Sequence, residues 1–186
     1  GVKIGVPGLT RLRGSDGQID WHTPFPFGGH SPVVGNNGTI FAISGLDVPR
    51  LVAVDAVSGA AKWDATATNT LSASTISVPV IGADGVIYLT RAETWASGIG
   101  GYAIIQAFDE ESGALQKEMV INRAFSTSPT MGFDGTLYLS ASNTLSAYRS
   151  GSPGPANSPW PMQAQNPRRT WSQAAGLFPL MGSIVS

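Results

Sequence analysis

Val78-Pro-Val-Ile-Gly-Ala-Asp-Gly-Val-Ile-Tyr88 is the stretch of sequence that decides the fold, because its pattern occurs three times. Ser31-Pro-Val-Val-Gly-Asn-Asn-Gly-Thr-Ile-Phe41 and Ser128-Pro-Thr-Met-Gly-Phe-Asp-Gly-Thr-Leu-Tyr138 align with it without gaps. Each copy places an Asx-Gly pair, ending at Gly38, Gly85 or Gly135, before β-branched and aromatic residues. Such a pair supplies the positive φ of a tight hairpin, and the residues after it favour a strand. Each copy therefore predicts a hairpin whose first strand begins just after its proline.

A second strand-and-turn element follows each of these hairpins and also opens the chain. Its clearest copy is Leu51-Val-Ala-Val-Asp-Ala-Val-Ser-Gly-Ala-Ala-Lys-Trp63, and residues 105–117 and 9–21 repeat the pattern. An alternating strand runs into a glycine turn, and a Trp or Lys follows four residues later. The glycines are Gly17, Gly59 and Gly113, and the later residues are Trp21, Trp63 and Lys117. A shorter last copy, Leu145-Ser-Ala-Tyr-Arg-Ser-Gly151, departs from the pattern after its turn.

The spacing of the two elements predicts an all-β fold made of four-stranded antiparallel blades. Gly38 and Gly85 lie 47 residues apart, and Gly85 and Gly135 lie 50 apart. This period is typical of a β-propeller blade. The expected units are a partial blade at 1–23, blades at 30–66 and 77–121, a partial blade at 127–150, and a tail at 151–186 that closes or packs on the propeller.

The composition excludes several functions. The 11 basic and 12 acidic residues give no charge bias toward nucleic acid. The absence of cysteine rules out disulfides, thiol catalysis and cysteine metal sites. No apolar run is long enough to predict a membrane span. The histidines, His22 and His30, lack a third metal ligand nearby, and Asp16 and Asp20 match a calcium loop only in part.

Two segments resemble a known family of repeats. Ala53-x-Asp55-x-x-x-Gly59-x-x-x-Trp63 resembles the tryptophan-docking motif of PQQ-type (quinoprotein-type) β-propellers, in which the Trp packs against the neighbouring blade. Lys117 replaces the Trp in the next copy. Ser158-Pro-Trp-Pro-Met-Gln-Ala-Gln-Asn-Pro-Arg-Arg-Thr170 resembles a stretch found at an end of such propellers in bacterial surface and exported members. The resemblance covers roughly residues 5–170.

The resemblance implies that this chain is part of a larger assembly. Seven or eight blades are usual in the family, and this chain holds three to four of them. We therefore expect a partner, either the remaining half of the propeller or a second copy of the chain. A closed four-bladed propeller is the alternative. The implied location is periplasmic, cell-surface or extracellular.

Ligands of propellers usually bind where the blade-to-blade connections open. The longest of these is predicted between Arg91 and Tyr102, and its Arg91, Glu93, Trp95 and Tyr102 could stack on and hydrogen-bond a sugar or quinone ring. Alternatively, Trp95 packs back onto its own blade. His22 and His30 are expected on the same face.

The expected function is a non-catalytic module that binds protein or carbohydrate or acts as a scaffold, including one for outer-membrane assembly or adhesion. No Gly-x-Ser-x-Gly elbow or other convergent catalytic set is present, so no catalytic residue, metal or cofactor is predicted. The alternative is a fragment of a quinoprotein dehydrogenase, which the resemblance would supply with PQQ and calcium. Without cysteine the vicinal disulfide of such enzymes cannot form, and no segment matches their catalytic Asp motif.

Overall fold

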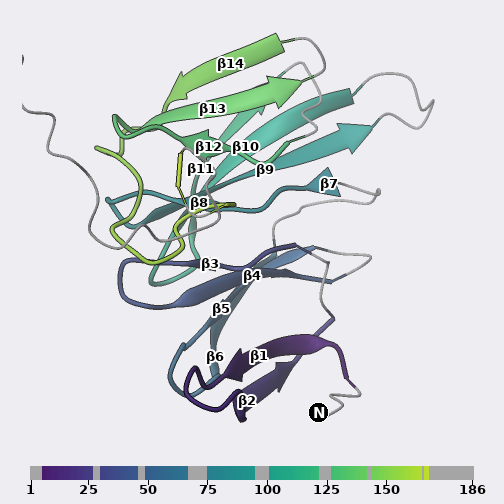
Figure 1. Ribbon diagram of the computed structural model, residues 1–186. Coiled ribbons are helices and arrows are strands. Elements are labelled where there is room, and N and C mark those ends of the chain that lie inside the picture. Colours follow the sequence, from purple (N-terminus) through teal and green to yellow (C-terminus); the bar gives the residue numbers. More distant parts are fainter. Residues whose placement is uncertain are drawn as a thin grey trace, which may run out of the picture.

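The computed structural model describes residues 6–26, 30–45, 49–66, 75–94, 101–121, 127–141, 144–164 and 166–167. These residues form antiparallel sheets, and none of them is helical. Figure 1 shows the sheets following one another from β1 and β2 at one end of the molecule to β14 at the other. The all-β prediction is therefore confirmed.

The four sheets follow the order of the chain. The first sheet pairs two strands, β1 (Gly8–Leu12) and β2 (Ile19–Pro24). The second has four in sequence order, β3 (Val33–Val34), β4 (Ile40–Ser44), β5 (Arg50–Val54) and β6 (Ala61–Thr66). The third contains β7 (Thr75–Ile76), β8 (Val80–Ile81), β9 (Val86–Thr94), β10 (Gly101–Asp109) and β11 (Leu115–Ile121). The fourth contains β12 (Thr130–Met131), β13 (Thr136–Ala141) and β14 (Thr144–Arg149).

The glycines of both repeated elements have the left-handed backbone that their turns need. Gly38, Gly85 and Gly135 have φ values of 76°, 77° and 78°. Gly17, Gly59 and Gly113, in the later turns, have 70°, 75° and 71°. Only glycine adopts these angles without steric strain, so the turns fix where each strand reverses. The strands β3, β8 and β12 begin directly after Pro32, Pro79 and Pro129.

The third sheet is longer than the sequence predicted. Residues 91–94 and 101–102 continue β9 and β10, with Arg91 paired to Ile104 and Glu93 to Tyr102. The prediction that 91–102 is a connecting loop is therefore wrong for these residues. The polar side chains interrupt the apolar alternation, but the backbone pairing continues through them. The extended β9 also offers an edge to β7, which pairs with Ala92 and Arg91.

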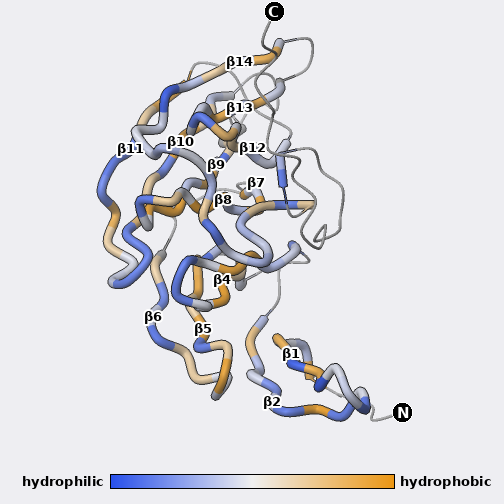
Figure 2. Tube along the Cα trace, turned by 60° about the vertical axis from the view of Figure 1, so that its left-hand side comes forward, coloured by the Kyte–Doolittle hydropathy of each residue, from blue (hydrophilic) through white to orange (hydrophobic). Residues whose placement is uncertain are grey.

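Hydrophobic clusters fill the spaces between successive sheets. The second and third sheets share a core that includes Phe41, Leu51, Ile87, Leu89 and Phe108. The third and fourth share two smaller clusters, and one of them includes Tyr88, Met131, Leu137 and Met162. Figure 2 shows hydrophobic colours along β4 and β5 and more hydrophilic ones along β6 at the sheet edge. The third sheet thus packs against the second on one face and against the fourth on the other.

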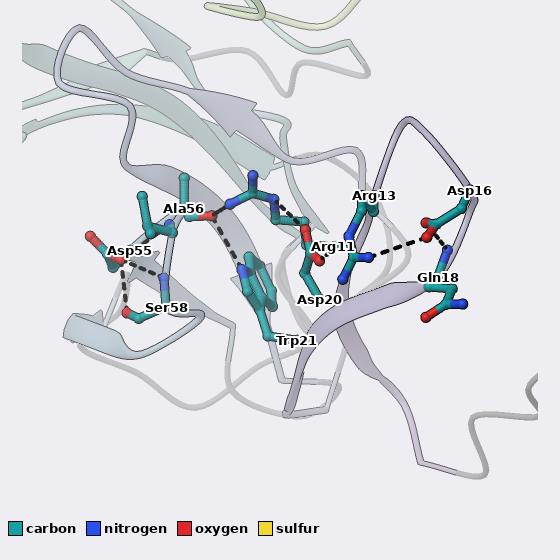
Figure 3. A network of polar contacts seen from close by, with 10 residues as sticks. Arg11, Arg13, Asp16, Gln18, Asp20, Trp21, Asp55, Ala56 and Ser58 are labelled. Carbon is teal, nitrogen blue, oxygen red and sulfur yellow. Dashed lines mark hydrogen bonds and ion pairs between the residues drawn. The ribbon is translucent and has the colours of Figure 1, made fainter.

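A hydrogen bond at one repeat position joins the first sheet to the second and the second sheet to the third. The indole of Trp21 donates to the Ala56 carbonyl at 3.2 Å, and Arg11 donates to the same oxygen at 2.8 Å (Figure 3). Trp63 donates to the carbonyl of Glu110 at 3.3 Å. Trp21 also lies on Gly59, and Trp63 on Gly113, so closely that an added Cβ would come within 2.6 Å of the ring.

The third interface uses a different residue for this contact. Lys117 stands where the other copies have Trp, and the hydroxyl of Tyr88 donates to the Ser150 carbonyl at 3.3 Å. Ser150 aligns with Ala56 and Glu110 in the repeat. A tyrosine on β9 therefore replaces the tryptophan of the outer strand.

A buried polar link joins the turns of the second and third sheets. The amide of Asn36 donates to the carboxylate of Glu110 at 3.0 Å and to the Gly82 carbonyl at 3.2 Å. The backbone N–H of Glu110 donates to the Gly85 carbonyl at 2.9 Å. Because Glu110 is buried, these bonds hold the two turns in one relative position.

The segment after Gly151 leaves the fourth sheet and runs along the edges of β3 and β8. Its carbonyls accept hydrogen bonds from backbone N–H groups at these sheet edges, which would otherwise lack a partner in the sheet. Val34 N–H donates to Trp160, Ile81 N–H to Pro161 and Ala83 N–H to Gly154, at 2.7 to 2.9 Å. Met162 is fully buried in the core between the third and fourth sheets. The strands β3 and β8 contact each other, so this segment lies where the two sheets converge.

Candidate functional site

A groove of about 590 Å³ lies between the first and second sheets. It is formed where β2 ends, where β4 ends and where β5 begins, and by the middle of β6. The lining residues are Thr23, Pro24, Phe25, Pro26, Ser44, Gly45, Arg50, Val52, Ala61, Lys62, Trp63 and Asp64. The residues that follow β2, through Pro26, and those on either side of the β4–β5 connection, Gly45 and Arg50, therefore meet here.

Backbone bonds hold the proline-rich wall of the groove in place. The N–H of Phe25 donates to the Pro7 carbonyl at 3.2 Å, and Gly45 N–H donates to the Pro26 carbonyl at 2.7 Å. The hydroxyl of Thr23 donates to the carbonyl of Gly59. Prolines with fixed φ, anchored at both ends, lose little freedom when a ligand binds.

The opposite wall carries three charges. Arg50 and Asp64 form an ion pair at 2.8 Å, and their side chains remain 45% and 50% exposed. Lys62 donates to the hydroxyl of Thr39 at 2.8 Å. An exposed ion pair contributes at most about 1 kcal/mol to stability. Its charges are therefore available to a ligand at little cost to the fold.

The groove follows the outer edge of β6. Ala61, Lys62, Trp63 and Asp64 are consecutive, so their side chains alternate between the two faces of the sheet. Because all four line the groove, it extends around the strand edge. β6 pairs with β5 on one side only within the part of the chain that the structure describes. The groove thus offers an aromatic and proline wall, charged side chains and a strand edge.

The two histidines do not line this groove. His22 lies in β2, where its Nδ1 is 2.9 Å from the hydroxyl of Thr10. His30 lies between the first and second sheets along the chain, and partial burial lowers the pKa of its imidazole. Thr23, directly after His22, is a lining residue. A ligand-binding role for the two histidines stays a prediction.

Three of the other four predicted residues, Arg91, Glu93 and Tyr102, belong to the third sheet. Arg91 is buried within β9, Glu93 pairs through its backbone with Tyr102 of β10, and Tyr102 is half-buried. Trp95 lies outside the described residues. Arg91 and Tyr102 are not among the residues that line the groove. A sugar or quinone site formed by them stays a prediction.

Sequence reasoning missed Phe25, Arg50, Lys62 and Asp64. Phe25 lies between the two histidines that were expected on the ligand-binding face, and this aromatic residue was the available signal. Arg50 and Asp64 meet because Arg50 pairs with Thr66 and Val52 with Asp64 across β5 and β6. That register had to be known before the pair could be recognised.

Other features of the described residues are less informative. A second cavity of about 420 Å³ lies beside the tail and is lined mostly by its prolines and small residues, with Phe133. No group of three or more His, Asp or Glu side chains is arranged to hold a metal within the described ranges. No helix long and apolar enough to cross a membrane occurs among those residues either.

Comparison with known proteins agrees with the repeat architecture. No curated protein matches this chain. A model of the family described as outer membrane protein assembly factor BamB, a PQQ-like repeat family, matches residues 2–100. The match covers more than half of the 186 residues and includes the first two copies of the Pro-x-x-Gly-x-Asx-Gly pattern. The chain therefore belongs to the PQQ-like β-propeller repeat family whose description is outer membrane protein assembly factor BamB.

Proposed function

We propose that this chain is a non-catalytic propeller scaffold that binds an extended segment of another protein in the groove along β6. The observation that carries the proposal is the coincidence of a strand edge with proline, aromatic and charged side chains in one groove. An exposed strand edge can pair with an extended peptide through backbone hydrogen bonds, while flanking side chains supply specificity.

The family supports a protein ligand over a carbohydrate. The description of the matching family concerns the assembly of outer membrane proteins, which is a task of handling polypeptides. Carbohydrate would be the expected ligand if flat aromatic stacking dominated, but here the Arg50–Asp64 ion pair and residues of the edge strand β6 also line the groove. The implied place of action is an exported compartment, in the periplasm or at the cell surface.

The experiment measures binding of fluorescently labelled peptides of about ten residues that alternate apolar and charged side chains. We expect saturable binding by fluorescence anisotropy, with Phe25→Ala and Asp64→Ala each weakening it about tenfold. Phe133→Ala and Glu111→Ala are matched controls, because both residues are exposed and lie away from the groove. These controls should bind like the unmodified protein.

Three results would contradict the proposal. Equal weakening by the control variants would show that the groove does not select the peptide. Stoichiometric uptake of PQQ in the presence of calcium, followed by dye reduction with alcohols or sugars, would favour the dehydrogenase alternative. A charged oligosaccharide that competes fully with the peptide would shift the ligand class to carbohydrate.

A further inference from the structure

The edge strands β2, β6 and β11 each carry a β-bulge at the same repeat position. In β6, Ala61 and Trp63 are paired with consecutive residues of β5, so Lys62 between them has no partner residue in the register. The same register shift leaves Asp20 of β2 and Gln116 of β11 without a partner residue on the neighbouring strand. A bulge of this kind changes the direction in which the extra side chain points. The repeat therefore presents one polar side chain at the bulge of each of these strands.

The bulge residues of the first and third sheets bind polar groups of their own hairpins. Asp20 forms ion pairs with Arg11 at 3.4 Å and with Arg13 at 3.1 Å. The side-chain amide of Gln116 donates to the carboxylate of Asp109 at 3.3 Å. Neither Asp20 nor Gln116 is among the residues that line the groove along β6. These two side chains therefore stabilise their own turns.

Lys62 differs from both, because it lines the groove and its charge is not balanced there. Its ammonium donates to the hydroxyl of the buried Thr39 at 2.8 Å. This bond positions the ammonium but does not neutralise it, since the hydroxyl is uncharged. Arg50 and Asp64, the other charged lining residues, pair with each other at 2.8 Å. No ion pair involves Lys62 within the described ranges, so the lining residues carry a net positive charge.

The carboxylate of Asp55, in the turn between β5 and β6, is already bound within that turn. Hydrogen bonds from the backbone N–H and the hydroxyl of Ser58 lower the pKa of Asp55 most, and the charge of Lys62 lowers it least. Its Oδ1 accepts from the N–H of Val57 at 3.1 Å and from both groups of Ser58 at 2.8 Å. Asp55 therefore senses Lys62 without forming an ion pair with it, which leaves the ammonium available to a ligand.

We propose that Lys62 makes the groove selective for an extended peptide that carries a carboxylate, which the ammonium binds beside the edge of β6. The inference rests on the proposed peptide-binding function and names the class of peptide. Hydrogen bonds between an ammonium and a carboxylate are stronger than the neutral bond that Lys62 makes with Thr39. The carboxylate comes from an Asp or Glu side chain or from the C-terminus of the peptide, and the experiment separates these two sources.

Fluorescence anisotropy with matched labelled peptides tests the selectivity. The peptides share their apolar positions and have an amidated C-terminus, and their alternate polar positions are all Glu, all Gln or all Lys. We expect the Glu peptide to bind about threefold to fivefold tighter than the Gln peptide, which is the range that an exposed ion pair supplies. The Lys peptide should bind most weakly. Should the Gln peptide gain this affinity with a free C-terminus instead, the C-terminal carboxylate is the group bound.

Variants at two bulge positions assign the selectivity to Lys62. Lys62→Glu should reverse the order, so that the Lys peptide binds tightest. Lys62→Met keeps an apolar stem and should remove the preference for a carboxylate, while Lys62→Arg should retain it. Gln116→Glu is the matched control, because it places a negative charge at the same bulge position of β11, away from the groove. It should leave the order of the peptides unchanged.

The results that overturn this inference differ from those that overturn the peptide groove itself. Equal binding of all peptides would overturn the selectivity alone. So would an order that Lys62→Glu leaves unchanged, or one that Gln116→Glu reverses as fully as Lys62→Glu does. Binding of none of the peptides would overturn the proposed function and this inference with it.

Discussion

At the scale of single residues, Tyr88 makes the contact that tryptophan makes elsewhere in the molecule. Its hydroxyl reaches the Ser150 carbonyl at 3.3 Å, at the repeat position where Trp21 and Trp63 meet Ala56 and Glu110. Burial, followed by the nearby charge of Asp84, raises the pKa of the Tyr88 phenol. The sequence pattern did not predict this contact, because Lys117 occupies the Trp position and Tyr88 lies on a different strand.

Removing this hydroxyl should weaken the third interface. We expect Tyr88→Phe to lower the free energy of unfolding by about 0.5–1.5 kcal/mol, the usual contribution of one hydrogen bond. Tyr138→Phe is the matched control, since Tyr138 aligns with Tyr88 and is partly exposed. Urea denaturation followed by circular dichroism measures both. Equal effects of the two variants would show that the Ser150 contact contributes nothing.

Gly59 adopts a positive φ and also leaves room for the Trp21 ring. A comparison with Gly17 separates these two roles. Gly59 and Gly17 both have positive φ, but an added Cβ at Gly17 meets nothing within 4 Å, whereas at Gly59 it meets the Trp21 ring. Gly17→Ala should therefore cost about 1–2 kcal/mol for backbone strain. Gly59→Ala should cost about 1–3 kcal/mol more, because the indole must move. Equal losses in thermal unfolding would contradict the close packing of Trp21.

The aspartates of the later turns should make stability depend on pH. A hydrogen bond from the Ser112 hydroxyl, followed by one from its backbone N–H, lowers the pKa of Asp109. A carboxyl with a lower pKa in the folded state stabilises the fold above the ordinary Asp range, and this contribution is lost as the pH falls through the folded pKa. Ser112→Ala should raise the pKa of Asp109, as measured by NMR titration of the carboxyl carbon. An unchanged pKa would contradict this cause.

At the scale of elements, the hairpins were predictable and the connections were not. Asx-Gly pairs and turn glycines specify where strands reverse, so the hairpins within each sheet followed from the sequence. The extension of β9 through Arg91 and Thr94 was missed because polar residues there look like a loop. The groove was missed in part because it needs the strand register of β5 and β6 and the packing of two sheets.

The tail after Gly151 is a structural element although it forms no long strand. Its carbonyls accept hydrogen bonds from β3 and β8, and Met162 fills the core between the third and fourth sheets. We expect Met162→Ala to destabilise the protein by about 2–5 kcal/mol, since it would leave a cavity. Met119→Ala, at a position that is 38% exposed, should cost far less. Chemical denaturation compares the two, and similar losses would mean that the tail does not pack as described.

At the scale of the whole molecule, each sheet contacts mainly the sheets before and after it. Stability in such an arrangement is approximately a sum over repeats and the interfaces between neighbours. The contacts that Trp21, Trp63 and Tyr88 make with the next turn are examples of such interface contributions. The same repeat therefore specifies both the strands of each sheet and the contacts between neighbouring sheets.

Whether successive sheets stack is tested most directly by the contact of each indole with the glycine turn of the following sheet. A proton NMR spectrum should show the α-protons of Gly59 and Gly113 shifted upfield, with nuclear Overhauser effects to the rings of Trp21 and Trp63 respectively. Those signals arise only if a tryptophan ring covers the turn of the following sheet. Glycine α-protons at ordinary shifts, without contacts to either indole, would contradict the stacked arrangement.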